Sequence, residues 1–186
     1  RALDYETIVE SIYLNRGYQI TSNVLPIIPW AYDVAIEPYT YDPNAARRLL
    51  EGAGWIDTNN DGIRERGTTP LVLGLLVVTG NTAHEQLADL VQDQLNSVGF
   101  DIAITPVDAT TLATQLLSQR YDMAITGWTE LGADPNDDWL WTAQHDRPSS
   151  DFNFVSYQNA EVDRLLQQAN SVPGCKPEDR APLYKQ

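Results

Sequence analysis

The sequence predicts an α/β fold in which an open, mostly parallel sheet carries helices on both faces. From Leu71 onward, apolar strand segments alternate with amphipathic helices: strand 71–78, helix 82–98, strand 102–107, a helix after Asp108 and strand 123–126. The first of these strands is apolar on both faces, which is typical of a parallel strand covered by helices. The order therefore predicts a βαβαβ unit with right-handed crossovers.

Helix start and stop signals define the remaining elements. Asp4 is expected to cap a first helix, which Gly17 ends. Asp42 followed by Pro43 predicts a second helix start, because proline suits the first helical position. Its expected apolar stripe consists of residues 49, 50 and 53. Three further helices are predicted over 135–143, over 160–169 and from Pro177 onward.

Composition limits the class of protein. With 186 residues, 42% hydrophobic and 20% charged, the chain is predicted to be globular, and its length suggests one domain. Twenty-six acidic and twelve basic residues give a net charge of −14, which argues against nucleic acid and anionic membranes as partners. We expect a monomer. Cys175 is the single cysteine, so no disulfide can form within the chain.

The sequence contains no recognisable catalytic grouping. His84 and His145 have no neighbours at the spacing of metal ligands, and there is no nucleophile elbow, phosphate-binding loop or dinucleotide fingerprint. We therefore predict a protein that is not an enzyme and has no cofactor. One alternative stays open: a secreted carbohydrate-active enzyme whose carboxylates lie in the acidic loop 130–138.

A short acidic segment has two interpretations. Asp57, Asn59, Asp61 and Gly62 match the first half of a calcium-binding loop, but Thr68 stands where that loop requires a carboxylate. The same residues are a signal for a tight turn. We predict the turn, with no metal, and keep calcium as the alternative.

The candidate binding site lies just after the last predicted strand. Trp128 opens a polar loop that also contains Thr129, Glu130 and Asp134. Ligands of open α/β sheets bind beyond the carboxyl ends of the strands, and tryptophan offers a large, rigid contact surface there. For Asp134 the competing interpretation, an N-cap before Pro135, is favoured.

Two further features belong to this hypothesis. Thr79 and Asn81 lie between a strand and a helix N-terminus, where free backbone N–H groups can meet a carbonyl or an anion, although capping explains them as well. Trp139 and Trp141 follow Trp128 closely. Such a cluster can stack on sugar rings, but packing of Trp139 and Leu140 on the sheet is the favoured interpretation.

The chain resembles the solute-binding proteins of ABC importers, in the family that takes up oligopeptides, dipeptides and nickel. The resemblance spans nearly the whole chain and rests on segments in the order that this family shows. They are RALDYETIVESIYLNRG, DPNAARRLLEGAGW, DTNNDGIRERGTTPLVLGLLVV, LADLVQDQLNSVGFDIAITPVD, YDMAITGW, NAEVDRLLQQA and EDRAPLYKQ.

This resemblance implies that residues 1–186 form the second large lobe, of the type II periplasmic-binding-protein class, of a longer two-lobed protein that exceeds this chain at both ends. Such proteins close around a solute, a peptide or an oligosaccharide, and deliver it to a membrane permease from the periplasm or as cell-surface lipoproteins. Peptide-binding members often carry an aspartate three residues after the tryptophan, to pair with the ammonium group of the ligand. Here that residue is Leu131, and the neighbouring Glu130 is the nearest substitute. A ligand-sensing lobe of a receptor is a further alternative.

Overall fold

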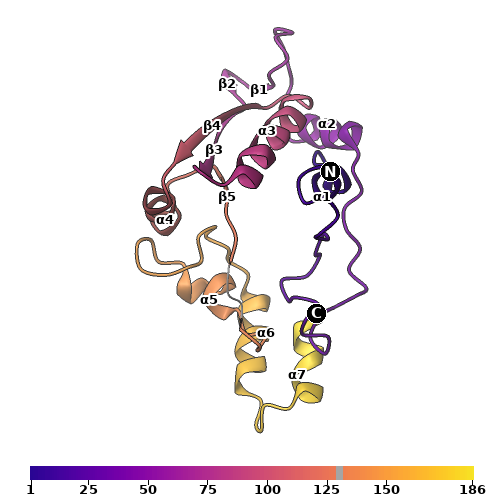
Figure 1. The fold of residues 1–186 in the computed structure, drawn as a ribbon, viewed down its shortest axis with the longest axis vertical. Coiled ribbons are helices and arrows are strands. Elements are labelled where there is room, and N and C mark those ends of the chain that lie inside the picture. The colour runs from indigo at the N-terminus through magenta and orange to yellow at the C-terminus, as the bar shows by residue number, and fades with distance from the viewer. Residues whose placement is uncertain (129–131) are drawn as a thin grey trace. The chain divides into compact units, whose positions relative to one another are not determined.

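The computed structural model describes residues 1–128 and 132–186, and these form two compact units (Figure 1). The first unit contains Arg1–Gln19, Tyr39–Leu112 and Tyr121–Gly127. The second contains Ile20–Pro38, Ala113–Arg120 and the described residues from Trp128 to Gln186. That the whole chain makes one lobe of a two-lobed protein stays a prediction.

The first unit is built on a parallel sheet of three strands in the order β4-β3-β5. The strands are β3 (Val72–Val78), β4 (Asp101–Val107) and β5 (Met123–Ile125). Val72 pairs with Asp101, and Leu75 pairs with Met123. The predicted alternation of parallel strands and helices is confirmed, and the apolar strand 71–78 is the central one.

Helix α3 (Thr82–Asn96) supplies the core of this unit. Ala88, Val91 and Leu95 recur at helical spacing and pack with Leu75, Val77 and Ile102 of the sheet. Asn81 caps the helix by accepting a hydrogen bond from the backbone N–H of His84 at 3.2 Å. The chain then turns at Gly99, whose φ of +108° suits glycine.

Two side chains of α3 also bind the outer edge of β4. Gln92 donates its Nε2 to the carbonyl of Ile102 at 2.6 Å, and Asn96 accepts the Ile102 N–H at 3.0 Å. Helix and strand are thus joined by polar as well as apolar contacts, on the side of β4 that faces away from β3.

Two helices precede the sheet in the chain: α1 (Tyr5–Ser11) and α2 (Pro43–Gly52). Both predicted caps are confirmed, because the Asp4 carboxylate accepts the Thr7 N–H and the Asp42 carboxylate accepts the Ala45 N–H. The prediction that α1 extends to Gly17 is wrong. It ends at Ser11, and the chain beyond it takes positive φ values at Leu14 and Asn15, which no α-helix accommodates.

The expected apolar stripe of α2 also needs correction. Leu49 is 64% exposed, and the buried residue of this helix is Ala46. After α2 the chain forms a short antiparallel hairpin of β1 (Glu65–Arg66) and β2 (Thr69–Pro70).

The second unit is helical. Its elements are the end of α4 (Ala109–Ser118), α5 (Asp138–Trp141), the 3-10 turn η1 (Ala143–His145), α6 (Ala160–Ser171) and α7 (Pro177–Tyr184). The irregular segment 20–38 contributes Val24, Ile28 and Ala31 to a core that also contains Leu166, Ala169 and Tyr184. The predicted helices over 160–169 and from Pro177 are confirmed. No helix in the described part of the chain is both long and apolar enough to cross a bilayer.

Candidate functional site

Trp128 lies in the second unit against three aromatic rings. Its centroid is 5.0 Å from that of Trp139 and 6.3 Å from that of Phe152, both edge-on, and 5.9 Å from that of Phe154, in a stacked arrangement. We call these four residues the aromatic cluster. Trp128 and Phe152 remain 44% exposed, so the cluster presents an apolar surface to solvent.

Phe152 and Phe154 were not predicted, although two phenylalanines in a polar loop are an unusual pattern. They flank Asn153, a fully buried residue. The amide of Asn153 donates to the carbonyls of Thr142 and Tyr157, and its Oδ1 accepts the Tyr157 N–H at 2.9 Å. Because every polar group of this side chain is engaged, the backbone between the two rings is firmly held.

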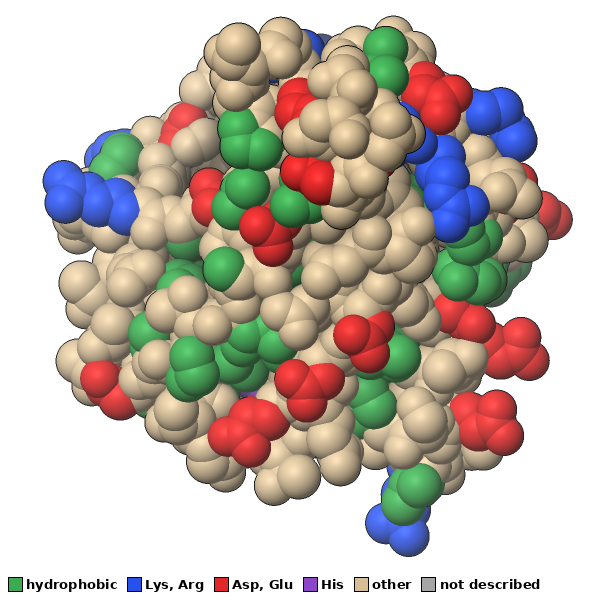
Figure 2. Space-filling view, turned by 90° about the horizontal axis from the view of Figure 1, so that it is seen from above, with side chains coloured by type: hydrophobic (Ala, Val, Ile, Leu, Met, Phe, Trp, Pro, Cys, Tyr) green, Lys and Arg blue, Asp and Glu red, His purple; other side chains and the backbone are tan. Residues whose placement is uncertain are grey.

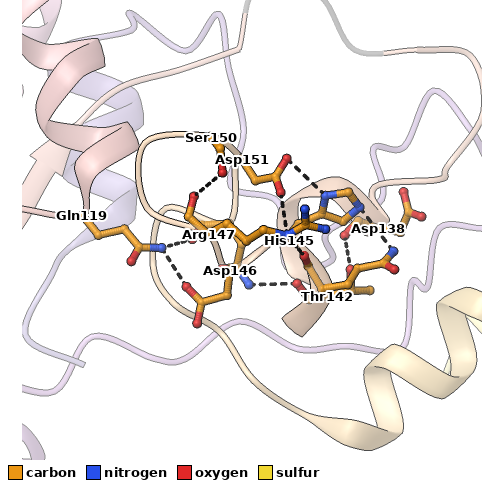
Figure 3. Close-up of polar contacts among 10 residues, drawn as sticks. Gln119, Asp138, Thr142, His145, Asp146, Arg147, Ser150 and Asp151 are labelled. Atoms are coloured by element: carbon orange, nitrogen blue, oxygen red, sulfur yellow. Dashed lines mark hydrogen bonds and ion pairs between the residues drawn. The ribbon is translucent and has the colours of Figure 1, made fainter.

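A polar network holds the loop that connects η1 to the aromatic cluster (Figure 3). Gln119, at the end of α4, donates to the Asp146 carboxylate and to the Asn153 carbonyl, both at 2.8 Å. Hydrogen bonds from Gln158 and Gln119 lower the pKa of Asp146, so this carboxylate stays ionised. The loop is closed by Asp151, which pairs with Arg147 at 3.3 Å.

Asp134 does not start a helix. The predicted helix 135–143 is reduced to α5, and Asp134 instead forms two hydrogen bonds to the Arg180 guanidinium, at 2.6 and 2.8 Å. These bonds lower the pKa of Asp134. The N-cap interpretation is therefore wrong, because a charged partner 46 residues away competes for the carboxylate that would cap the helix.

A pocket of about 550 Å³ opens beside the aromatic cluster, since Trp139 belongs to both. Its apolar wall includes Val24, Leu25, Ile28 and Pro135. Its polar wall includes Asn23, Asp134, Asn136, Asp137, Asn170 and Arg180. A cavity that combines an apolar wall with convergent polar groups has features of a small-molecule site, although this one is more polar than most.

The remaining predicted site residues are distributed as follows. Thr79 and Asn81 belong to the first unit, at the carboxyl end of β3. The N–H of Thr79 is bound by the Val107 carbonyl, and the N–H of Gly80 is bound by the Glu85 carboxylate, both at 2.9 Å. With Asn81 as the cap for the His84 N–H, three backbone donors at this turn already have partners, which favours the capping interpretation. Thr129 and Glu130, like Leu131, lie outside the described residues.

The acidic segment after α2 folds as the predicted turn. Asp57 accepts hydrogen bonds from the N–H groups of Asn60 and Gly62, at 2.7 and 3.1 Å. Glu65, which the sequence pattern did not include, brings a third carboxylate near Asp57 and Asp61, with oxygens within 4.8 Å of one another. Each of the three carboxylates accepts hydrogen bonds from nearby N–H groups.

Acidic side chains (red) are dispersed among uncharged atoms on the face drawn in Figure 2, with Lys and Arg (blue) in isolated positions. In the described residues, Trp139 contacts the rings of Trp128 and Phe152, which are aromatic neighbours that sequence periodicity does not reveal.

Comparison with known proteins gives a consistent result. The model of the family described as "Bacterial extracellular solute-binding proteins, family 5 Middle" matches residues 1–151. The oligopeptide-binding protein AppA of Bacillus subtilis is 29% identical over 175 residues, which are 92% of this chain and 32% of that protein. Di/tripeptide-binding protein 1 of Pseudomonas aeruginosa is 26% identical over the whole chain and 32% of its own length.

The solved structure of the Bacillus subtilis oligopeptide-binding protein AppA, in complex with a nonapeptide, superimposes with a TM-score of 0.85 at 28% identity. It covers 100% of this chain, which in turn covers 36% of that structure. The chain thus spans about a third of the length of the relatives it matches.

Proposed function

Because the chain belongs to the bacterial extracellular solute-binding proteins of family 5, we propose that it is a ligand-binding lobe of an ABC-importer substrate-binding protein. Its solute is a peptide. The relatives described above are peptide-binding proteins about three times as long as this chain, which supports a complete protein with a second lobe.

The observation that carries this proposal is the exposed aromatic cluster. Trp128 and Phe152 keep 44% of their surface in solvent, although neighbouring rings and the Asn153 network hold the cluster in place. A rigid aromatic surface costs little conformational entropy on binding and suits the side chains and backbone planes of a peptide.

We propose capture without chemical turnover. The two lobes of the complete protein close on the solute by a hinge motion, and the closed form docks on the membrane permease. The protein works outside the cytoplasm, in the periplasm or as a lipoprotein at the cell surface. Because Leu131 replaces the aspartate of many peptide-binding members, the ammonium group of the peptide pairs with another carboxylate, for which Glu130 is the candidate.

The test is to identify the solute on the complete protein. Native mass spectrometry of the purified protein should detect a bound peptide, and calorimetry should then give its affinity. A free pentapeptide, its N-acetylated form and a cello-oligosaccharide of similar size are the matched probes. Binding of the free peptide, weakened by acetylation, supports the proposal. Binding of the sugar alone would reassign the solute to an oligosaccharide, and cleavage of it would indicate an enzyme.

A further inference from the structure

Arg180 is a buried cation at the junction of three segments of the second unit. The residue is 6% exposed. Its Nε donates to the Ala169 carbonyl of α6 at 2.9 Å, and its Nη2 donates to the Tyr184 hydroxyl of α7 at 2.8 Å. The guanidinium also lies over the rings of Trp30 and Tyr184, at 5.6 and 5.4 Å. Its orientation is therefore fixed from several sides.

Two further donors of Arg180 are directed at Asp134. Nη1 and Nη2 bind the two carboxylate oxygens of this residue, at 2.6 and 2.8 Å. Such a paired contact fixes the direction of the carboxylate as well as its distance, which a lysine ammonium does not do. Asp134 is itself 55% exposed at its side chain, so the buried arginine holds an otherwise exposed loop.

From Asp134 the contacts continue along the chain to α5. Asp134 Oδ1 accepts the Asn136 N–H at 3.0 Å, and Asn136 Oδ1 accepts the Asp138 N–H at 3.2 Å. Asn170 of α6 also donates to Asn136 Oδ1 at 3.0 Å. The next residue of α5 is Trp139, whose ring lies edge-on against Trp128.

We propose that Arg180 is a positioning residue for Trp128: through Asp134 and Asn136 it fixes α5, and through Trp139 it fixes the ring that contacts the solute. The role in solute binding rests on the proposed function. The positioning of the ring does not, and the two are tested separately.

The first experiment follows the rings without any solute. The chain is labelled with 5-fluorotryptophan, and the five tryptophan resonances are assigned by single replacements with phenylalanine. Arg180→Lys should shift or broaden the signals of Trp128 and Trp139, while Trp55, in the first unit, stays unchanged. The matched control is Arg164→Lys, which alters an exposed arginine that pairs with Glu161 within α6 and should move neither signal.

This first experiment has a clear contrary outcome. Trp30 touches Arg180 directly, so its signal shifts in either case. A change confined to Trp30 would mean that Arg180 only stabilises the core around α6 and α7. If Arg180→Lys does not fold, Asp134→Asn tests the same contact from its exposed side and carries the same expectation.

The second experiment is a double-mutant cycle on the complete protein, with the peptide found by mass spectrometry. Arg180→Lys should weaken peptide binding about tenfold in the wild-type background, and less than about threefold in the Trp128→Ala background. Equal losses in both backgrounds would overturn action through Trp128. If the wild-type protein binds no peptide, the proposed function fails, while the fluorine spectra still decide the positioning role.

Discussion

Trp128 combines three aromatic contacts with a large exposed fraction, and this combination leads to a prediction for its removal. Trp128→Ala should destabilise the second unit by about 1–2 kcal/mol, less than the roughly 3–5 kcal/mol of a buried aromatic, because 44% of the residue is already in water. In the complete protein it should weaken solute binding by about 1–3 kcal/mol. Urea denaturation and calorimetry measure the two quantities.

The matched control for Trp128→Ala is Trp55→Ala, which removes a tryptophan of the first unit that lies under Arg66. It should leave the affinity unchanged. If Trp128→Ala unfolds the chain instead, the ring is a core residue. If the mutant is stable and binds its solute as the wild type does, the binding site lies elsewhere.

Asp137 gives a pH-dependent prediction. Burial raises the pKa of its carboxyl, although hydrogen bonds from Asn23 and Trp141 act in the opposite direction. Its buried Oδ1 has no hydrogen-bond partner among the residues that the structure describes. The folded state therefore holds this proton more tightly than the unfolded state. Protonated Asp137 therefore contributes to the free energy of unfolding at low pH, and this contribution is lost as pH rises through the raised pKa.

Asp137→Asn removes this titration. The unfolding free energy of the mutant relative to the wild type should therefore increase as pH rises from 4 to 7, measured by urea denaturation at each pH. The exposed Asp93→Asn is the control for the change in net charge and should show no such trend. A constant difference across this range would contradict the prediction.

At the residue scale, the sequence predicts local contacts and misses distant ones. Asp4, Asp42 and Asn81 cap helices because their partners lie three residues away. Asp134 has the same local signal, but Arg180, far along the chain, binds its carboxylate. The phenylalanines that contact Trp128 were missed for the same reason, since only the folded loop brings them there.

The turn between α3 and β4 depends on a glycine. A Cβ on Gly99 would lie 2.5 Å from Cγ of Arg64, whose side chain is buried and hydrogen-bonded to the Val98 carbonyl. Gly99→Ala should therefore destabilise the first unit by about 2–4 kcal/mol, from backbone strain and from collision together. Gly62 also has a positive φ but has no atom near its Cβ position.

Gly62→Ala is thus the matched control for backbone strain without a collision. It should lower the free energy of unfolding by about 1 kcal/mol. Chemical denaturation of the two variants gives the comparison. Equal losses of unfolding free energy in the two variants would mean that the Arg64 side chain moves aside easily. The close approach of Arg64 to Gly99 would then not be what requires glycine in this turn.

The acidic turn between α2 and β1 gives a prediction about metals. Asp57, Asp61 and Glu65 are close together, but each carboxylate already accepts hydrogen bonds that stabilise its charge. The chain should therefore have the same melting temperature in EDTA and in millimolar calcium. A large rise with calcium, abolished by Glu65→Gln, would show that the turn is a cation site.

The elements themselves were largely predictable, because strands β3 to β5 and helices α3, α6 and α7 combine strong periodicity with clear boundaries. The exceptions have physical causes. Helix α5 is short because Asp134 is held elsewhere, and Leu49 is exposed although it continues an apolar pattern. Periodicity shows which face of a helix is apolar, but it does not show how much of that face is covered.

At the scale of the whole molecule, the chain passes repeatedly between two compact units. Segment 20–38 packs with the helices of the second unit, and no local sequence pattern predicts this. The two units have separate hydrophobic cores, around Leu75 and around Leu166. Sequence distance therefore gives little information about which segments share a core.

The net charge of −14 predicts the behaviour of the whole chain in solution. Mutual repulsion between acidic surfaces should keep it monomeric, with a mass of 20.8 kDa by light scattering at physiological salt. At 1 M salt this repulsion is screened. The same mass is still expected there, because the contacts between α3 and β4 described below also oppose association. A doubled mass at high salt alone would show that charge is the single barrier to association.

The contacts between α3 and β4 provide a second barrier. Asp101 and Val107 bond toward β3, so residues 102, 104 and 106 face the outer side of β4. There, Gln92 and Asn96 occupy the carbonyl and the N–H of Ile102, and Pro106 has no N–H to offer. A foreign strand would find both groups of Ile102 occupied and no N–H at Pro106, so its ladder of hydrogen bonds along this edge would be interrupted. Helix α3 and one proline thus oppose amyloid-like growth at this edge, even where the acidic surface is neutralised.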